Sequence, residues 1–194
     1  MRPERVLAAL ALVLSGCGGG VAARGGDGTT VTAAVDSTRD GFSLNVYRNI
    51  VRGKVIDSFA RLNEGDATRA LGLMSDDVHY TFEGAHALGG TRVSKQGVEK
   101  WFARLFRLIP GRFTLRSVEV VGGPWRSTVY TVFEDVVTPA WGEAYRNHGV
   151  QVVELEWGTA VRIHTYVDTA KVERALAVLA AHGVSEAAAA PIVE

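Results

Sequence analysis

The spacing of apolar residues changes along this chain, and that change limits the folds it can adopt. In residues 51–62 and 98–109, large apolar side chains recur every three or four positions, as on one face of a helix. In residues 113–167 they alternate with polar residues, which is typical of strands that bury one face. Helices followed by strands joined through short turns predict an α+β fold with a curved, mainly antiparallel sheet.

One domain, residues 45–184, is expected to hold all these elements, followed by a frayed tail at residues 185–194. A chain of 194 residues with 47% hydrophobic content can bury one good core. Start and stop signals and apolar spacing predict three helices at 45–64, 66–74 and 95–109, a strand at 78–82, four strands at 113–121, 127–137, 145–155 and 160–167, and a last helix between Asp168 and Gly183.

The first seventeen residues have the layout of an export signal. Arg2 and Arg5 precede the apolar run Val6–Leu14. This run is too short to cross a bilayer, which takes about 20 residues. The Gly-, Ala- and Thr-rich residues 18–44 are predicted to be a flexible tether. The alternative is a wrongly assigned start codon, since Glu4 interrupts the basic segment.

The end of this apolar run, Leu14-Ser15-Gly16-Cys17, resembles the lipobox of bacterial lipoproteins. The resemblance implies that residues 1–17 are removed up to Cys17, and that Cys17 carries a lipid. An exported protein anchored outside the cytoplasmic membrane by that lipid alone is therefore expected.

Composition argues against several classes of protein. Acidic and basic residues balance at 21 each, so there is no strong positive field for nucleic acid. The five histidines form no His-x-His or His-x-x-x-His pair, and the glycine clusters lack the Lys-Ser/Thr ending of a phosphate loop. Neither a metal nor a cofactor is predicted.

Short motifs follow one another in a fixed order through the predicted domain. They are Phe59-x-x-Leu62-Asn63-x-Gly65-Asp66, Asp76-Asp77-Val78, Gly84 with Gly89-Gly90, Tyr145-x-Asn147 ahead of Gly158, and Tyr166-x-Asp168-Thr169. In this order they resemble the SnoaL-like branch of the nuclear transport factor 2-like superfamily, which includes ketosteroid isomerases and polyketide cyclases. The resemblance implies a cone-shaped roll of sheet and three N-terminal helices, closed by a C-terminal helix, around a pocket for a small, often apolar molecule. It also implies a homodimer through the outer sheet face.

The acids and bases of the related enzymes are absent at the matching positions. The isomerase base falls on Phe82, its tyrosine on Ser58 and its second acid on Val150. The carboxylate of related epoxide hydrolases and cyclases falls on Thr165. A phenyl ring cannot accept a proton and a valine cannot stabilise an oxyanion, so the isomerase reaction is not expected.

Four ionisable residues remain as catalytic candidates, each with a structural alternative. Glu83, one position after the base, is either a displaced base or a solvated loop acid. His148 and Glu154 share a register and face either the pocket or the dimer partner. Asp168 precedes a helix, where capping is favoured over catalysis.

Pocket walls are predicted from the apolar faces of the expected elements. The predicted lining residues are Phe59, Tyr80, Phe82, Trp101, Leu105, Val150, Val152, Ile163 and Thr165. Three functions remain open: binding of a small apolar molecule, which the pattern favours; an isomerase-, cyclase- or dehydratase-type enzyme on a polyketide- or steroid-like substrate; and an accessory envelope protein with a filled pocket.

Overall fold

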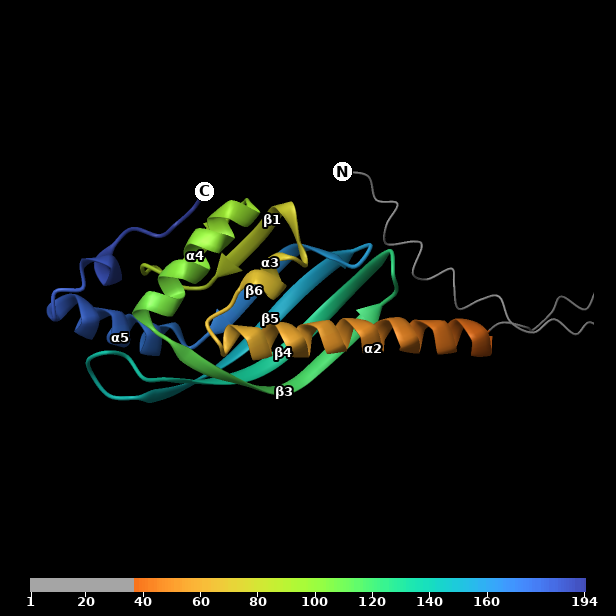
Figure 1. Ribbon diagram of the computed structural model, residues 1–194, viewed down its shortest axis with the longest axis horizontal. Helices are drawn as coiled ribbons and strands as arrows, with labels where there is room; N and C mark the ends of the chain where they lie inside the picture. Colours follow the sequence, from red (N-terminus) through yellow and green to blue (C-terminus); the bar gives the residue numbers. More distant parts are fainter. Residues whose placement is uncertain (1–36) are drawn as a thin grey trace, which may run out of the picture. The chain divides into compact units, whose positions relative to one another are not determined.

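A curved six-stranded sheet forms the centre of the domain in the computed structural model, which describes residues 37–194 (Figure 1). Its order is β2-β1-β6-β5-β4-β3. The strands are β1 Met74–Phe82, β2 Gly90–Arg92, β3 Gly111–Gly122, β4 Arg126–Val137, β5 Tyr145–Glu156 and β6 Thr159–Val167. All neighbouring strands are antiparallel except β1 and β6. The predicted α+β class with a mainly antiparallel sheet is confirmed.

Helices accompany this sheet. They are α2 Ser37–Leu62, α3 Thr68–Leu71, α4 Lys95–Leu108, α5 Thr169–Ala181 and the short 3₁₀ helix η1 Ser185–Ala188. Within residues 37–194, none of the helices is both long and apolar enough to span a membrane. The predicted signal peptide with Cys17, and the predicted tether up to residue 36, lie outside the described residues.

Helix α4 packs on the inner face of the sheet at β1 and β2. Ser94 caps it by accepting a hydrogen bond from the backbone N–H of Gly97 at 3.0 Å, and Pro110 follows its end. Its buried face carries Trp101, Phe102 and Leu105, at the helical spacing seen in the sequence. This amphipathic stripe is the reason why the helix packs with its aromatic side toward the sheet.

Helix α2 begins earlier than predicted, because residues 37–44 are helical and are not part of a tether. Leu44 packs close to Gly123 in the β3–β4 turn, and the Tyr47 hydroxyl lies 2.8 Å from Ser127 Oγ. These tertiary contacts hold α2 at the end of a segment, residues 18–44, whose composition alone favours a flexible chain. Propensity is a weak prior when packing opposes it.

The sheet differs from the prediction on its β1 side. β1 begins at Met74 and pairs in parallel with β6, and the Gly-rich loop before α4 contains the short strand β2. Periodicity identifies a strand but says nothing of its direction or of its partner. A register shift between Leu115 and Ser117 in β3 marks a bulge, which adds to the bend of the sheet.

The C-terminal residues 185–194 pack against α4, where a frayed tail was predicted. Glu186 forms ion pairs with Arg104 and Arg107, at 3.4 Å and 2.6 Å. The Val93 N–H donates to the Glu194 carbonyl at 3.2 Å, and Ala187 is buried. The Ala-rich composition gave no sign of these contacts, because they depend on arginines about 80 residues away in the chain.

Candidate ligand-binding cavity

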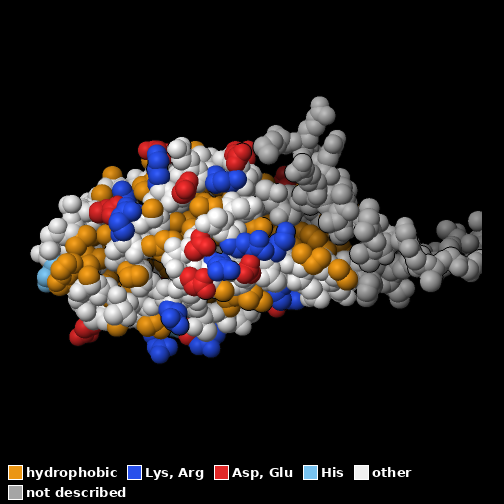
Figure 2. Space-filling model, in the orientation of Figure 1, with side chains coloured by type: hydrophobic (Ala, Val, Ile, Leu, Met, Phe, Trp, Pro, Cys, Tyr) orange, Lys and Arg blue, Asp and Glu red, His pale blue; other side chains and the backbone are white. Residues whose placement is uncertain are grey.

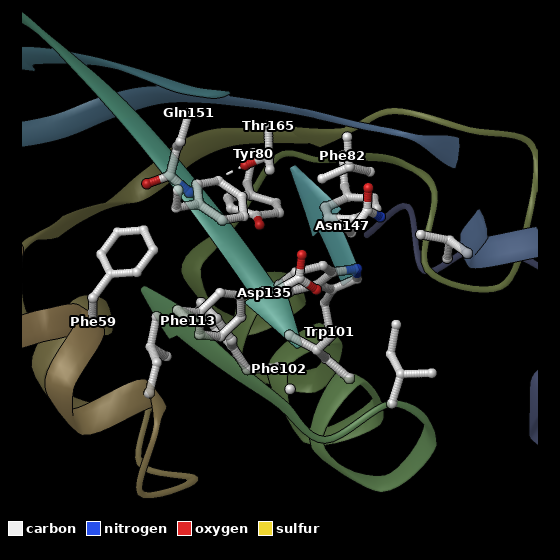
Figure 3. Close-up of a pocket in the computed structure, with 17 residues that line it drawn as sticks. Phe59, Tyr80, Phe82, Trp101, Phe102, Phe113, Asp135, Asn147, Gln151 and Thr165 are labelled. Carbon is white, nitrogen blue, oxygen red and sulfur yellow. Dashed lines mark hydrogen bonds between the residues drawn. The ribbon is translucent and has the colours of Figure 1, made fainter. Parts of the chain in front are cut away.

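The inner face of the sheet and helix α4 enclose a hollow lined mostly by aromatic rings (Figure 3). Its cavity volume is about 60 Å³. Aromatic side chains from five elements form most of the wall: Phe59, Tyr80, Phe82, Trp101, Phe102, Phe113 and Phe133. Small-molecule sites are typically concave and apolar with a few placed polar groups, so this hollow is the candidate site.

Alternation along β1 and the helical stripe of α4 bring the largest rings together. Tyr80 and Phe82 are two residues apart and point to the same side of the sheet. The Trp101 ring lies between them, with centroids 4.8 Å from Tyr80 and 5.4 Å from Phe82. Trp101 Nε1 donates to the Leu88 carbonyl at 2.7 Å, which fixes the ring against the loop before β2.

Tyr80, Gln151 and Thr165 form a polar strip on the β1, β5 and β6 side of the cavity. Gln151 Nε2 donates to Thr165 Oγ1 at 3.1 Å. Burial raises the pKa of Tyr80 to about 12, against smaller opposite effects of a Thr165 hydrogen bond and the Arg92 charge. Tyr80 is therefore a neutral phenol at physiological pH, able to donate or accept one hydrogen bond.

Asp135, on β4, places a carboxyl group on the opposite side of the cavity. Burial raises its pKa above the ordinary value, while His148 and Lys171 oppose the rise. Its Oδ1 is buried and has no hydrogen-bond partner among the described residues, and the same holds for the Tyr145 hydroxyl on β5. Burial, and then the charge of Asp135, raise the pKa of Tyr145. A buried carboxyl oxygen without a hydrogen-bond partner is unusual and requires an explanation.

Asn147 also lines the cavity, but its hydrogen bonds are structural. Its Oδ1 accepts from the backbone N–H groups of His148 at 2.9 Å and Asp168 at 3.2 Å. Its Nδ2 donates to the Asp168 carbonyl at 3.3 Å. The side chain therefore links β5 to the start of α5, and its polar atoms are already paired.

Most of the predicted pocket residues lie on the cavity wall. Phe59, Tyr80, Phe82, Trp101, Leu105 and Thr165 line it. Ile163 is buried on the same face of β6 as Thr165, but it packs into the core beside the cavity.

Val150 and Val152 differ from the prediction, because they lie on the outer face of the sheet. Val150 is 38% exposed and pairs with Tyr166, while Val152 pairs with His164. The residues of β5 that line the cavity are Asn147 and Gln151. Side-chain period fixes which residues share a face, but a shift of one residue exchanges the two faces.

The four predicted catalytic candidates are not brought together at the cavity. His148 and Glu154 are on the outer face, where His148 Nδ1 lies 3.6 Å from Glu134 and Glu154 lies 3.5 Å from Arg162. Glu83 lies 2.5 Å from His164.

Asp168 is at the start of α5, where its side chain accepts from the Lys171 N–H at 3.3 Å. Of the two roles considered for Asp168, capping of α5 is the one that the structure shows. Ser58, at the tyrosine position of the isomerases, donates to the Lys54 carbonyl within its own helix.

Sequence reasoning missed Asp135, although a signal for it was present. Along β4, Val129, Thr131, Phe133, Asp135 and Val137 occupy one face, and four of these five are buried. An acid on the apolar face of an alternating strand is a candidate site residue. Within residues 37–194, no group of three or more His, Cys, Asp or Glu side chains is placed to hold a metal ion.

Comparison with solved structures identifies the fold class as NTF2-like. An NTF2-like protein of unknown function from Burkholderia pseudomallei is 23% identical, with a TM-score of 0.56 over 64% of this chain and 95% of that chain. A Bacillus subtilis protein provisionally named an isomerase is 17% identical, with a TM-score of 0.56 over 66% and 92%. TerC, co-crystallised with polyporic acid, is 22% identical, with a TM-score of 0.53 over 64% and 95%. At these identities the likeness concerns the fold alone.

Residues 55–163 match the family model of the SnoaL-like domain. The match covers more than half of the chain, so the chain belongs to the SnoaL-like domain family. No curated protein matches the chain significantly.

Proposed function

We propose that this protein binds a small, mostly apolar, ring-shaped molecule whose one polar group faces Asp135. The observation that carries the proposal is the unpaired buried Oδ1 of Asp135 at the edge of an aromatic hollow. Buried polar atoms are nearly always hydrogen-bonded, so a ligand hydroxyl or carbonyl is the expected partner of this group. A protonated Asp135 donates this hydrogen bond and an ionised Asp135 accepts it.

The size of the cavity limits how such a ligand enters. A cavity that binds benzene in a protein core measures about 150 Å³, whereas the cavity here measures about 60 Å³. A ring-sized ligand must therefore displace a lining side chain. Phe113 and Val167 are among the lining residues that keep partial exposure, and we propose that the entrance lies between them. The SnoaL-like family and the co-crystallisation of TerC with polyporic acid support a ring-shaped organic ligand.

Blocking the entrance tests the binding proposal. Phenol is the probe, and its affinity is measured by isothermal calorimetry. Val167→Phe is expected to weaken binding by at least tenfold, because the added ring occupies the entrance. Ile56→Phe, on the exposed face of α2, is the matched control and is expected to leave the affinity unchanged. Equal phenol affinity in both variants contradicts binding in the cavity.

Asp135 also favours a second candidate, an isomerase- or cyclase-type enzyme in which it is the acid or base. A carboxyl with a raised pKa in a closed site suits proton transfer to or from a carbon next to a carbonyl. The test is exchange of the α-hydrogens of 2-tetralone in D₂O, followed by NMR. An enzyme accelerates the exchange above buffer, and Asp135→Asn abolishes the acceleration; no acceleration in the wild type excludes this candidate for that ketone.

The outer face of the sheet supports the proposal of a homodimer. Four large side chains on this face are each 38–45% exposed: Tyr130, Val132, Val150 and Tyr166. A contiguous apolar patch of this kind commonly marks an interface. Val150→Glu places a charge in its middle and is expected to yield monomers in analytical ultracentrifugation. A wild type that sediments as a monomer at all concentrations contradicts the dimer.

Export and lipid attachment at Cys17 are proposed from the sequence pattern. The test is mass spectrometry of the protein purified from the envelope of its own cells, with Cys17→Ser as the control. A lipidated cysteine as the first residue is expected. An N-terminus that still begins at Met1 contradicts the proposal.

A further inference from the structure

Two tryptophans lie side by side at one end of the sheet. Trp125 is in the turn between β3 and β4, and Trp157 is in the turn between β5 and β6. They are 65% and 70% exposed, and their ring centroids are 6.4 Å apart in an edge-to-face arrangement. The backbone N–H of Trp157 donates to the Trp125 carbonyl at 3.2 Å, which holds the two turns together. We call this pair the tryptophan patch.

The backbone at Trp157 is unfavourable for a tryptophan. Its φ is 52°, and it is the only described non-glycine residue with a positive φ; the next residue, Gly158, has a φ of 77°. Two consecutive positive φ values are typical of a tight hairpin turn, where Asn, Asp or Gly is preferred at the first position. The side chain gains little from packing, because most of it is exposed. Strain at an exposed residue that contributes little to the core points to a role outside the fold.

The tryptophan patch lies at the end of the domain where α2 begins (Figure 1). Tyr47 contacts Ser127, and Arg48 donates to the Gly122 carbonyl at 3.2 Å, so the N-terminal half of α2 adjoins the β3–β4 turn. Residues 18–36 can span at most about 65 Å when fully extended. That length allows the start of α2 to approach a bilayer in which Cys17 is anchored.

The chemistry of the patch fits the interface of a membrane. Tryptophan concentrates at the boundary between lipid and water, because its ring is largely apolar and its Nε1–H is polar. Charge does not explain the patch, since exposed Arg126 and Glu156 are cross-strand neighbours of opposite sign beside it. Acidic and basic side chains are also intermixed on the face drawn in Figure 2. Attraction to the surface would therefore come from the rings.

We propose that Trp125 and Trp157 insert into the lipid–water interface of the membrane that carries the Cys17 anchor. The choice of a membrane as the partner rests on the proposed lipidation of Cys17. The anchor holds the chain close to the bilayer, and the tryptophan patch fixes which end of the domain faces it. The entrance of the cavity, near Phe113 and Val167, is formed by the other ends of β3 and β6 and stays away from the lipid surface.

Vesicle binding of the full chain with Cys17→Ser measures the patch without the lipid. The vesicles contain phosphatidylethanolamine and phosphatidylglycerol, and the readouts are co-sedimentation and the blue shift of tryptophan fluorescence. The chain is expected to bind, and Trp125→Ser with Trp157→Asn is expected to weaken binding by about tenfold or more. Trp141→Ser is the matched control, because Trp141 is 43% exposed in the β4–β5 loop and stacks on His182. Its vesicle binding is expected to equal that of the parent chain.

Three results overturn this proposal. The first is a parent chain that does not bind these vesicles; phenol binding and lipidation of Cys17 are measured separately, so their outcomes are unaffected. The second is an equal loss of binding in Trp141→Ser, which indicates unspecific adsorption. The third is a double variant that binds vesicles normally, and a loss of self-association in that variant would assign the patch to a second copy of the chain. Unfolding is monitored alongside, and Trp157→Asn is expected to be at least as stable as the parent, because asparagine tolerates this backbone.

Discussion

His164 Nε2 lies 2.5 Å from Glu83 Oε1, on the side of the sheet that faces away from the cavity. The Tyr166 ring stacks on His164 with centroids 4.1 Å apart, while Phe82 and Thr165 point into the cavity from the same two strands. The acid that follows the isomerase base position along β1 is thus held by a histidine. It cannot act on a molecule in the cavity.

Glu83 and Asp135 are therefore expected to differ in their effect on ligand binding. Glu83→Gln is expected to leave the affinity for phenol within about twofold of the wild type, because Glu83 does not line the cavity. Asp135→Val is expected to weaken it by about tenfold, which corresponds to one hydrogen bond. Calorimetry with benzene is the control, because benzene offers no polar group and Asp135→Val should not weaken its binding. A larger effect of Glu83→Gln than of Asp135→Val would reverse the assignment.

The pH dependence of folding reports the environment of Asp135. Burial raises its pKa, so the folded protein keeps a proton that the unfolded chain releases between the ordinary and the raised pKa. Its contribution to stability is therefore present below the ordinary pKa, near 4, and is lost as the pH rises through the raised value. Asp135→Asn carries no charge and is expected to gain stability relative to the wild type on going from pH 4 to pH 7. Chemical denaturation at both pH values measures this difference, and a constant difference would show an ordinary pKa.

Position 149 leaves no room for a side chain, because the Phe133 ring packs directly against Gly149. A Cβ at position 149 would lie 2.2 Å from Phe133 Cζ, closer than real contacts allow. Gly149→Ala is therefore expected to push this ring toward the cavity and to cost about 1–3 kcal/mol. Gly53→Ala, in α2, is the control: its Cβ would meet no atom within 4 Å, and it should stabilise by about 0.5–1 kcal/mol. Thermal unfolding of the two variants distinguishes a packing effect from a general effect of alanine.

Asn147 is expected to contribute more to the stability of the fold than Asp168, the cap residue of α5. It is 1% exposed and makes two hydrogen bonds to Asp168 that join β5 to the start of α5 and a third to His148 within β5, whereas Asp168 caps one N–H. Asn147→Ala leaves buried backbone groups unpaired and is expected to cost about 2–3 kcal/mol. Asp168→Ala is expected to cost about 1 kcal/mol. Equal losses in urea denaturation would show that the link from β5 to α5 is not specific.

Local patterns in the sequence were sufficient to predict the elements that depend on residues close together in the chain. The stripe of α4, the cap at Ser94 and the alternation of β3 to β6 depend on residues within a few positions of one another. The parallel pairing of β1 with β6 and the packing of residues 185–194 on α4 depend on distant partners. No spacing rule contains this information, and the prediction was wrong or silent there.

The cavity residues were predicted only in part, because local spacing does not determine which face of a strand points inward. The residues of β1, β6, α2 and α4 that line the cavity follow from periodicity, but on β5 the count from Gly158 selected the wrong face. β5 itself pairs with β4 without a register shift, and the extra residue at this end of the β5–β6 hairpin, Val161, belongs to β6. A count along β5 that is wrong by one residue exchanges the two faces, which is why Val150 was predicted inside and Gln151 is there.

We propose that Asp135 provides the polar end of a ligand site inside an aromatic hollow. A crystal structure of the protein soaked with phenol tests it most directly. We expect the phenol ring among Phe59, Phe102 and Phe133, with its oxygen within hydrogen-bond distance of the Asp135 carboxyl. A cavity that is filled by the protein's own side chains and contains no phenol would contradict this proposal. Phenol bound with its oxygen turned away from Asp135 would also contradict it.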